Sequence, residues 1–597
     1  MSKLKLALFG LFVLLAAGSW QAYEHNFNRQ PQIGYHADGT AARLMPEYSA
    51  SCFQAKQKSW SNPAKRSAWR RCQSYMHSHG ALQEFNRDFA LMHALGGVSI
   101  IAFLIMIGMG HFGKCPARHL RGPKLFRGRD ARRSLARSLR NECKRSGKGL
   151  EFPPGLKISR DRESRHMMIT GGVGSGKTQT MRHLMAAAMA RGDKVLILDT
   201  KGDVTASAPH EYTLIAPQDA RSDAWDIAKD CRVEQDAREL AARFIPKSDD
   251  PMWAEAARGL FAACVICLQT EKPGNWNWMD LYKRLCFKPE GLKDLAERYY
   301  PSAAQLIDDP TSKTALSILT TFKTFLPPIA ALAHAWGDQR HFTFSLSDWL
   351  EEHAGGVPII LQRDGRYPQL SNTWISALVG LLSSKVGSPS LEESEERRIW
   401  LFLDEFPQLE RMEDFTTLLD LGRSKGICVV LAAQDTSQIR IRYGRDRTNA
   451  WLSMVGTHII CRMNVGEGTN DISRALGFAE VEEPQKSRGH SGGHYTSSTS
   501  MQKRTRPVIT SSEIASELGP HKKGVRVLMV GAGQDYHMVD LPYIDTPKVR
   551  APHEPARWTT ENISLLDPPS FIPEAAPGLI SKAELEAIRE LKPEDKH

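Results

Sequence analysis

The chain has 597 residues, which is too many for a single hydrophobic core and predicts two to four domains. Its 41% hydrophobic content is typical of a globular protein, and ten cysteines in this length exclude a scaffold built from disulfides. Residues 111–150 hold 13 Lys and Arg residues against Asp130 and Glu142, which accounts for the whole net charge of +11. The rest of the chain is therefore neutral, and its net charge alone gives no support to nucleic-acid binding.

Two apolar segments near the N-terminus predict a membrane anchor. The first, residues 6–23, follows Lys3 and Lys5 and is close to spanning length. It can be a cleaved signal peptide or an uncleaved anchor, and we favour the anchor. The second, residues 89–112, contains no Asp, Glu, Lys or Arg and predicts a transmembrane helix, with a buried core helix as the alternative.

The basic segment at 113–150 sets the orientation of this anchor. It directly follows the second span, and Lys and Arg are enriched on the cytoplasmic side of membranes, so we expect both termini in the cytoplasm. The same segment is expected to contact anionic lipid headgroups. Residues 24–88 then form an extracytoplasmic loop that contains Cys52 and Cys72, and a disulfide between these two cysteines is left open.

Residues 171–178, GGVGSGKT, fit the phosphate-binding pattern G-x-x-x-x-G-K-[ST]. An apolar run at 166–170 predicts a strand before the loop, and 179–191 predicts a helix after it, which makes a chance glycine-rich turn the weaker alternative. Lys177 should reach the outer phosphates of a nucleotide, and the Thr178 hydroxyl should ligate Mg²⁺. The residues expected to contact the nucleotide are Gly171, Gly172, Val173, Gly174, Ser175, Gly176, Lys177, Thr178 and Gln179.

Two later strands are expected to end beside this loop. Residues 398–405 form an apolar strand that ends in two carboxylates, of which Asp404 should hold Mg²⁺ and Glu405 should polarise the attacking water. Residues 426–434 predict a buried strand that ends in Gln434. This glutamine either lies beside the γ-phosphate and senses hydrolysis or only caps a loop.

Strands alternating with helices from about residue 149 predict an α/β domain with a parallel sheet of the RecA-like type. An all-α insertion is expected at 231–345, so the nucleotide-binding domain comprises 151–230 and 346–550. Cys264 and Cys267 form C-x-x-C, but they lie in an apolar helical run where packing explains them better than metal binding. Residues 551–597 are interpreted as a C-terminal tail.

Two polar segments have more than one interpretation. The cluster of arginines with Tyr443 at 439–447 could be a strand that contacts a phosphate backbone, although a solvated loop is favoured. Residues 485–506 are rich in Ser, Gly and His, so we expect them to be disordered or to order only on contact with a partner.

Together these features resemble the TraD/TraG/TrwB-type coupling proteins of conjugative type IV secretion systems. The resemblance covers about residues 1–545 and rests on the two N-terminal spans, the phosphate loop, and the segments 198–204, 250–253, 403–409 and 433–439. Residues 217–226 and 244–253 are most similar to the TraD branch.

The resemblance implies an ATP- and Mg²⁺-dependent motor of the bacterial inner membrane, with two spans and a homohexameric ring. Its implied partners are the transferred DNA single strand, relaxase and relaxosome proteins, and components of the secretion channel. It also implies that Arg423, in the turn 422–426, is an arginine finger that reaches a neighbour's phosphates, with Lys425 as the alternative. A receptor for protein effectors that uses the nucleotide only as a switch, and pumps no DNA, is the second hypothesis.

Overall fold

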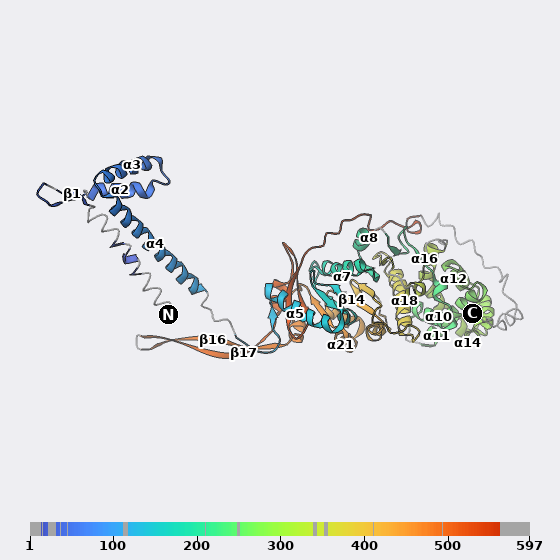
Figure 1. Cartoon of the computed structure of the whole chain (residues 1–597). Coiled ribbons are helices and arrows are strands. Elements are labelled where there is room, and N and C mark those ends of the chain that lie inside the picture. The colour runs from blue at the N-terminus through green and yellow to red at the C-terminus, as the bar shows by residue number, and fades with distance from the viewer. Residues whose placement is uncertain are drawn as a thin grey trace. The chain divides into compact units, whose positions relative to one another are not determined.

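The computed structural model describes residues 32–561, with gaps at 36, 44–45, 112–117, 209–210, 247–250, 338–342, 352–355, 410, 413 and 492–493, and a few residues between 13 and 21. The chain divides into two compact units (Figure 1). One comprises Met1–Arg118 and Glu482–Lys503, and the other comprises His119–Val481 and Arg504–His597. Each unit is described by itself.

A small helical core occupies the region predicted to be the extracytoplasmic loop. A hairpin of β1 (Gln32–Tyr35) and β2 (Ala41–Arg43) precedes α2 (Pro46–Lys58), α3 (Pro63–Ser78) and the long helix α4 (Leu82–His111). Asn62 caps α3 by accepting hydrogen bonds from two backbone N–H groups of its first turn. The buried side chains of this core are Cys52, Phe53, Cys72, Met76, Ala81 and Phe85.

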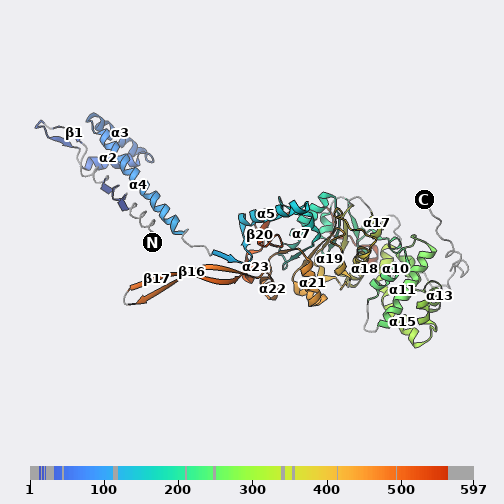
Figure 2. The same ribbon diagram turned by 60° about the horizontal axis from the view of Figure 1, so that its bottom comes forward.

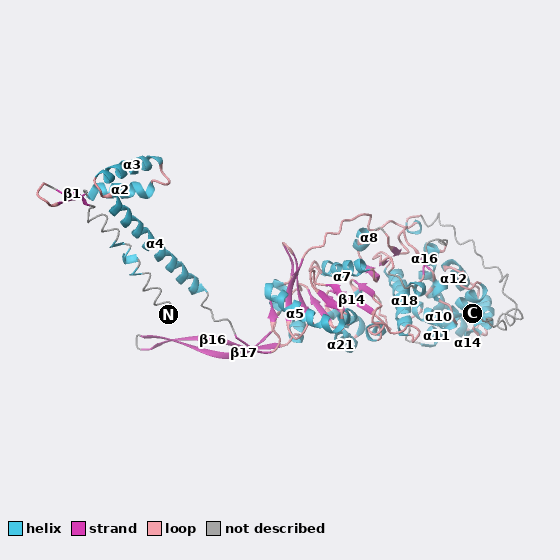
Figure 3. Ribbon diagram, viewed as in Figure 1, coloured by secondary structure: helices cyan, strands magenta, loops and turns pink. Residues whose placement is uncertain are grey.

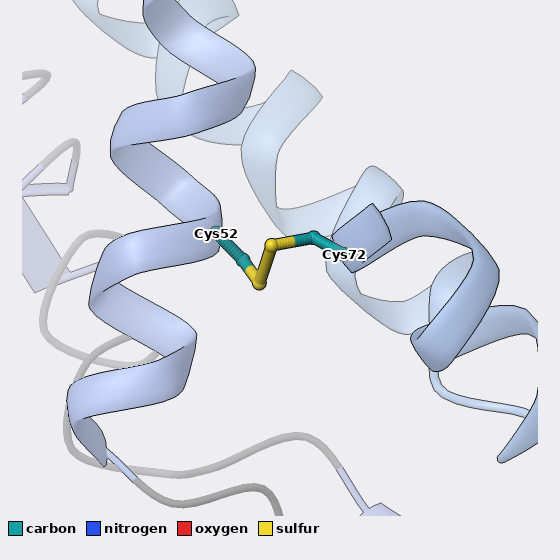
Figure 4. The surroundings of a disulfide bond; sticks show 2 residues. All are labelled: Cys52 and Cys72. Atoms are coloured by element: carbon teal, nitrogen blue, oxygen red, sulfur yellow. A yellow bond between two sulfur atoms is a disulfide. The ribbon is translucent and has the colours of Figure 1, made fainter. Parts of the chain in front are cut away.

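A disulfide joins α2 to α3 in this core (Figure 4). Cys52 and Cys72 are 20 residues apart, with their Cα atoms separated by 5.6 Å. Closing a loop of this length constrains the unfolded chain and stabilises the fold by about 3 kcal/mol. The pairing that the sequence left open is thus present in the structure.

The two predicted membrane spans differ in how much of them is described. The first, at 6–23, lies mostly outside the described residues. The second falls within α4, where the side chains of Val98, Ile100 and Ile101 are about half exposed or more. Within the described part of the chain, one helix, α11 (Pro251–Glu271), has the length and hydropathy to cross a bilayer by itself, as does the bent pair α15 (Lys313–Thr324) and α16 (Leu326–Trp336) if counted as one span. Because 61% of the apolar window of α11 is buried, we interpret α11 as a core helix.

The larger unit is built on an 11-stranded sheet that confirms the predicted α/β fold but is mixed rather than all parallel (Figure 3). Its order is β4-β20-β19-β15-β7-β14-β13-β8-β12-β9, with β18 paired to β19. The seven strands from β15 to β9 are parallel, and β19 is antiparallel to both of its neighbours in this order. The strands are β4 (Leu125–Phe126), β7 (Met167–Thr170), β8 (Lys194–Asp199), β9 (Thr213–Ile215), β12 (Ile359–Gln362), β13 (Ile399–Leu403), β14 (Ile427–Ala433), β15 (Thr457–Ile460), β18 (Gly519–His521), β19 (Gly524–Val530) and β20 (Tyr536–Leu541).

Both faces of this sheet are buried, which explains why its central strands are continuous apolar runs. Met167, Val195 and Val430 pack with α5 (Gly128–Ser146) and α7 (Lys177–Arg191) on one face. Met168 and Leu196 point the other way and share a core with α18 (Pro368–Gly387), α19 (Phe415–Asp420) and α21 (Arg445–Met454). Alternate residues of each strand therefore face the two helical layers.

The all-α insertion is bounded by a short pair of strands. β10 (Ala224–Trp225) pairs in parallel with β11 (Thr343–Phe344), so the chain leaves and re-enters the α/β domain at the same place. Between them lie α9 (Ile227–Asp230), α10 (Glu234–Phe244), α11, α12 (Trp278–Leu285), α13 (Pro289–Tyr299), α14 (Pro301–Ala304), α15 and α16, grouped beside α18 (Figure 2). Cys264 and Cys267 are buried in α11, and no cluster of potential metal ligands occurs in the part of the chain that the structure describes.

Much of the basic segment at 113–150 belongs to the α/β domain. β4 pairs with β20, and α5 buries Ala131, Leu135 and Leu139 against the sheet while its charged residues face outward. These three apolar residues recur every four positions, so they lie on one face of the helix. Seven of the 13 basic residues of this segment therefore lie on the exposed side of a packed helix.

Two predictions for polar segments are corrected by the structure. The described residues of 485–506 lie in β16 (Phe478–Ser491) and β17 (His494–Pro507), which form a three-stranded sheet with β3 (Arg118–Arg121) in the order β17-β16-β3. The arginine cluster at 439–447 is neither strand nor loop, because it lies in α20 (Thr436–Tyr443) and α21. Tyr443 is 3% exposed and packs against Trp451, so it is not available to stack on a base.

The first part of the segment interpreted as a tail contacts the α/β domain. The Trp558 indole N–H donates to the Pro217 carbonyl over 2.7 Å, and the Ala556 N–H donates to the Gln218 carbonyl over 2.8 Å. The Gln362 side chain donates to the Pro552 carbonyl over 2.7 Å. The chain therefore packs against this domain as far as about residue 561, and the segment from 562 onward lies outside the described residues.

Candidate nucleotide-binding site

The phosphate loop connects β7 to α7, and its glycines are required by its shape. Gly174 and Gly176 have φ values of 67° and 95°, which favour glycine. A Cβ on Gly171 would lie 2.5 Å from Ser175 Oγ, and one on Gly176 would lie 2.5 Å from Val525 Cγ1. Because α7 begins at Lys177, its free N–H groups and its partial positive charge lie at the loop, where they favour an anion.

Lys177 is a nearly buried cation at the centre of the site. Its side chain is 7% exposed, and Nζ donates to the carbonyls of Gly171 over 2.8 Å and Gly172 over 3.2 Å. Glu405 Oε1 lies 3.5 Å from the same nitrogen. These contacts hold the ammonium group beside the loop and neutralise its positive charge only in part. The group is therefore positioned to bind a phosphate oxygen.

Asp404 and Thr178 meet as the sequence predicts. Asp404 follows the end of β13, and its Oδ2 accepts a hydrogen bond of 3.4 Å from the Thr178 hydroxyl. Burial raises the pKa of Asp404, and the neighbouring Glu405 charge raises it further. Asp404 Oδ1 is buried and has no hydrogen-bond partner among the residues that the structure describes.

This arrangement fits Mg²⁺. A hydroxyl next to a carboxylate with an unsatisfied buried oxygen provides the hard oxygen ligands that this cation prefers. A cation would also compensate the burial of the Asp404 charge. Ser175 Oγ is a second buried polar atom without a partner within the described residues, and it lies in the loop itself.

Glu405 and Gln434 complete the cluster. Glu405 has a φ of 52°, an uncommon value for a residue with a side chain, at the sharp turn that follows β13. The Gln434 amide donates to Glu405 Oε2 over 3.4 Å from the end of β14. Strained residues occur often at functional sites, and here the strain lies at the predicted general base.

Arg423 lies away from this cluster. It precedes β14, whereas Gln434 follows it, and a strand of seven residues spans about 23 Å. The Arg423 guanidinium pairs with Asp161 over 2.9 Å, and its side chain is 53% exposed. It therefore cannot reach the phosphates bound by its own subunit, and it stays available on the opposite edge of the sheet.

Lys425, in contrast, is not available to contact a neighbouring subunit. It is 8% exposed, and Nζ donates to the carbonyls of Val386 over 2.7 Å and Ser388 over 2.6 Å. Those contacts tie Lys425 to the end of α18. Of the two residues considered for a finger, Arg423 is the one at the surface.

Sequence reasoning missed two neighbours of the site. Lys201 is close enough to Asp404 for its charge to oppose the rise in the pKa of that carboxyl. The segment 542–546 lies along α7, where the Ile544 N–H donates to Gln179 Oε1 over 3.2 Å. Lys201 follows the end of β8, which is next to β13, and this position could have predicted that it lies near Asp404. Residues 542–546 carry no sequence motif that could have predicted their position.

His166 supports the turn that carries Arg423. It is 1% exposed with a φ of 58°, its Nδ1 accepts from the Val429 N–H over 3.2 Å, and its Nε2 donates to the Leu419 carbonyl over 2.9 Å. Both ring nitrogens are thus satisfied only in the neutral form. Burial lowers the pKa of His166 to about 4.

We expect this histidine to make the α/β domain acid-sensitive. Because the folded pKa lies below the unfolded value of about 6.5, its contribution to stability is complete above pH 6.5 and is lost as the pH falls from 6.5 to 4. Chemical denaturation at pH 8 and 5 should show a loss of about 2 kcal/mol from this group. In His166→Asn, which tolerates positive φ and does not titrate, that part of the loss should be absent; equal acid sensitivity in both proteins would contradict the assignment.

Comparison with known proteins places the chain in a family. The family model for the type IV secretion-system coupling protein DNA-binding domain matches residues 152–542. This chain belongs to the type IV secretion-system coupling proteins. The matched range includes the phosphate loop, Asp404, Glu405 and Gln434.

Curated relatives of this coupling protein cover parts of it. The coupling protein TraD of Escherichia coli K12 is 28% identical over 332 residues, which cover 53% of this chain and 45% of TraD. A probable conjugal transfer protein TraG of Sinorhizobium fredii is 32% identical over 118 residues, which cover 20% of this chain and 18% of TraG. The coupling protein therefore spans less than half the length of each of these relatives.

Solved structures show the same fold. The bacterial conjugative coupling protein TrwBdeltaN70 has a TM-score of 0.60 and 23% identity, with 74% of this chain and 98% of that chain covered. The plasmid coupling protein TrwB in complex with ADP and Mg²⁺ has a TM-score of 0.59 and 23% identity, with 74% of this chain and 99% of that chain covered. The mixed, mostly parallel sheet of this coupling protein thus resembles the sheet of TrwB.

Proposed function

We propose that this coupling protein is an inner-membrane ATPase that links a DNA–relaxase complex to a type IV secretion channel and drives the transfer of DNA during conjugation. In this proposal it binds ATP with Mg²⁺, translocates a single DNA strand, and works as a homohexamer. Relaxase or relaxosome proteins bind on its cytoplasmic side. The two N-terminal spans hold it in the membrane, with both termini in the cytoplasm.

The observation that supports the proposal most is the convergence of Lys177, Glu405 and Gln434 beside the pair of Thr178 and Asp404. These side chains come from the start of α7, after the loop that follows β7, and from the ends of β13 and β14, and the three strands are neighbours in the sheet. Lys177 binds the outer phosphates, Glu405 accepts a proton from the attacking water, and Gln434 orients Glu405. A bound Mg²⁺ would supply charge neutralisation for the phosphate oxygens.

The proposed anchor and ring have separate support. Helix α4 is 30 residues long, exceeds the thickness of a bilayer core and exposes apolar side chains at 98, 100 and 101. Arg423 lies at the surface on the edge of the sheet opposite to its own site, which suits a residue that acts on a neighbour. Resemblance to a ring-forming family is consistent with this position.

Replacing Glu405 should separate hydrolysis from binding. We expect Glu405→Gln to lower ATP turnover by roughly 100-fold or more, because the general base is lost, while the affinity for ATP changes little. Asp404→Asn, a matched change next to it, should instead weaken Mg²⁺-dependent binding. Phosphate release and calorimetric titration measure the two effects, and full turnover by Glu405→Gln would contradict the assigned role.

DNA stimulation distinguishes a motor from a nucleotide-switched receptor. ATPase activity of a soluble fragment that begins before β3 should rise with single-stranded DNA, and the rise should decline steeply with salt because phosphate contacts release counterions. Duplex DNA and no DNA serve as comparisons. Turnover that is the same with and without DNA would favour the receptor hypothesis.

A further inference from the structure

The segment 542–546 is placed beside the phosphate loop by contacts with three residues of α7. The Ile544 N–H donates to Gln179 Oε1 over 3.2 Å, the His183 ring donates to the Pro542 carbonyl over 2.8 Å, and Arg182 donates to the Thr546 hydroxyl. Gln179 directly follows Thr178, and α7 begins only two residues earlier. The segment therefore runs along the first two turns of the helix that receives the phosphates.

Tyr543 is the aromatic side chain of this segment, and its hydroxyl is anchored. The hydroxyl donates to the His521 carbonyl over 3.1 Å, at the turn between β18 and β19. That same hairpin contacts the loop, since Val525 occupies the space where Gly176 would carry a Cβ. The tip of the ring is thus fixed at the turn between β18 and β19, and the residues on either side of Tyr543 are fixed along α7.

The ring itself remains available to a ligand. Tyr543 is 48% exposed, and no aromatic ring or cation packs against it in the part of the chain that the structure describes. An exposed aromatic side chain with its tip fixed offers a flat face at low entropic cost. Nothing in the chemistry of hydrolysis described above uses it.

The orientation of the bound nucleotide determines which of its parts lies near the Tyr543 ring. Lys177, Asp404 and Glu405 fix the end of the phosphate chain where hydrolysis occurs. The remaining end, which carries the ribose and base, must leave the loop on the side away from those carboxylates. In the sheet order, β20, which leads into the segment 542–546, lies on the opposite side of β7 from β13, which leads into Asp404 and Glu405. The segment contacts Gln179 from that side.

We propose that Tyr543 stacks on the base of the bound nucleotide, and so forms the nucleobase subsite of this ATPase. The inference rests on the proposed ATP binding and adds to it the residue that holds the base. Stacking recognises any planar base, so this subsite favours nucleotides over inorganic polyphosphates without selecting strongly among bases.

The test compares ligands with and without a base on the full chain in detergent micelles with Mg²⁺. Calorimetric titration with ATP, ADP and inorganic tripolyphosphate is done on the wild type, Tyr543→Ala and Tyr543→Phe. We expect Tyr543→Ala to bind ATP and ADP roughly tenfold more weakly and tripolyphosphate unchanged, because only the stacking contact is lost. Tyr543→Phe keeps the ring and should stay within about threefold of the wild type for all three ligands.

Controls separate this contact from general damage. Phe478→Ala removes another exposed aromatic side chain, on β16, and should leave all three affinities unchanged. Thermal denaturation checks that Tyr543→Ala is folded. Equal weakening of ATP and tripolyphosphate, or no change in either, would overturn the inference while leaving the proposed ATP binding intact. Failure of the wild type to bind ATP or tripolyphosphate would overturn the proposed function, and this inference with it.

Discussion

Lys177→Ala should reduce ATP hydrolysis by a factor of roughly 1,000 and remove the stimulation by DNA. The side chain supplies the one positive charge that the described structure places inside the loop, with Nζ fixed by the carbonyls of Gly171 and Gly172. Charge that develops on the outer phosphates in the transition state would lose this compensation, and losses of 10² to 10³ are typical for one preorganised electrostatic contact. The measurement is phosphate release with and without single-stranded DNA.

A neighbouring lysine provides the matched control for this variant. Lys201 is exposed and lies near Asp404, so Lys201→Ala removes the same charge from the rim of the site without touching the loop. We expect less than a tenfold effect from Lys201→Ala. Full DNA-stimulated turnover in Lys177→Ala would show that the loop does not perform the hydrolysis, and the motor hypothesis would be wrong.

The residues of the site could be predicted because each follows a strand within a short linear pattern. Lys177 and Thr178 belong to one motif, and Asp404, Glu405 and Gln434 each end a buried apolar run. The carboxyl ends of neighbouring parallel strands lie at the same edge of a sheet. The sequence motifs and the order of the strands together therefore bring these side chains into contact. The left-handed turn at Glu405, and the Asp404 oxygen that has no partner among the described residues, could be found only in the structure, because neither is marked by a pattern in the sequence.

The segments whose structure differs most from the sequence-based expectation share a physical cause, which is that a charged or polar composition obscures the few residues that pack. In α5 three small or branched apolar residues are enough to dock the helix, although Arg and Lys dominate its composition. In β16 and β17 the Ser- and Gly-rich composition is typical of disordered segments. The two strands can be recognised only from their backbone pairing in the structure. The arginines at 440–447 resemble a nucleic-acid contact, yet Arg440 forms an ion pair with Asp471 over 2.6 Å and Tyr443 is buried.

The segment 542–561 shows a different limit of sequence reasoning. Its contacts with Gln179, Pro217 and Gln218 join residues more than 300 positions apart in the chain. Such pairs have no period or motif, and the proline-rich composition from residue 551 onward suggests a tail. Only the tertiary structure places Tyr543 next to the phosphate loop.

Arg423→Ala should reduce hydrolysis by roughly 1,000-fold in the assembled protein while leaving ATP affinity nearly unchanged. An arginine finger typically contributes 10³ to 10⁵ to the rate, and it acts on phosphates already held by the other subunit. Within one chain the guanidinium is paired with Asp161 and lies about a strand's length from Lys177. The expected defect therefore concerns turnover, and it depends on contact between subunits.

Lys425→Ala tests the alternative finger. Its ammonium group is buried against the carbonyls of Val386 and Ser388, so its loss should lower the thermal stability of the domain. The rate per folded protein should stay within a few-fold of the wild type. A loss of rate in Lys425→Ala with an unaffected Arg423→Ala would reverse the assignment of the two residues.

Mixing two inactive variants gives the sharpest test of action between subunits. A subunit with Arg423→Ala retains its own Lys177, and a subunit with Lys177→Ala retains its own Arg423. A complete site forms where an Arg423→Ala subunit binds ATP and a neighbouring Lys177→Ala subunit contributes Arg423. If subunits assort at random and sites act independently, about a quarter of the sites in an equal mixture are complete. Such a mixture should therefore recover about a quarter of wild-type turnover. Recovery requires that Arg423 acts on a neighbour, because neither protein contains a complete set by itself. If mixtures stay inactive over all ratios although subunits exchange, Arg423 does not complete a neighbour's site, and its pairing with Asp161 is then its structural role.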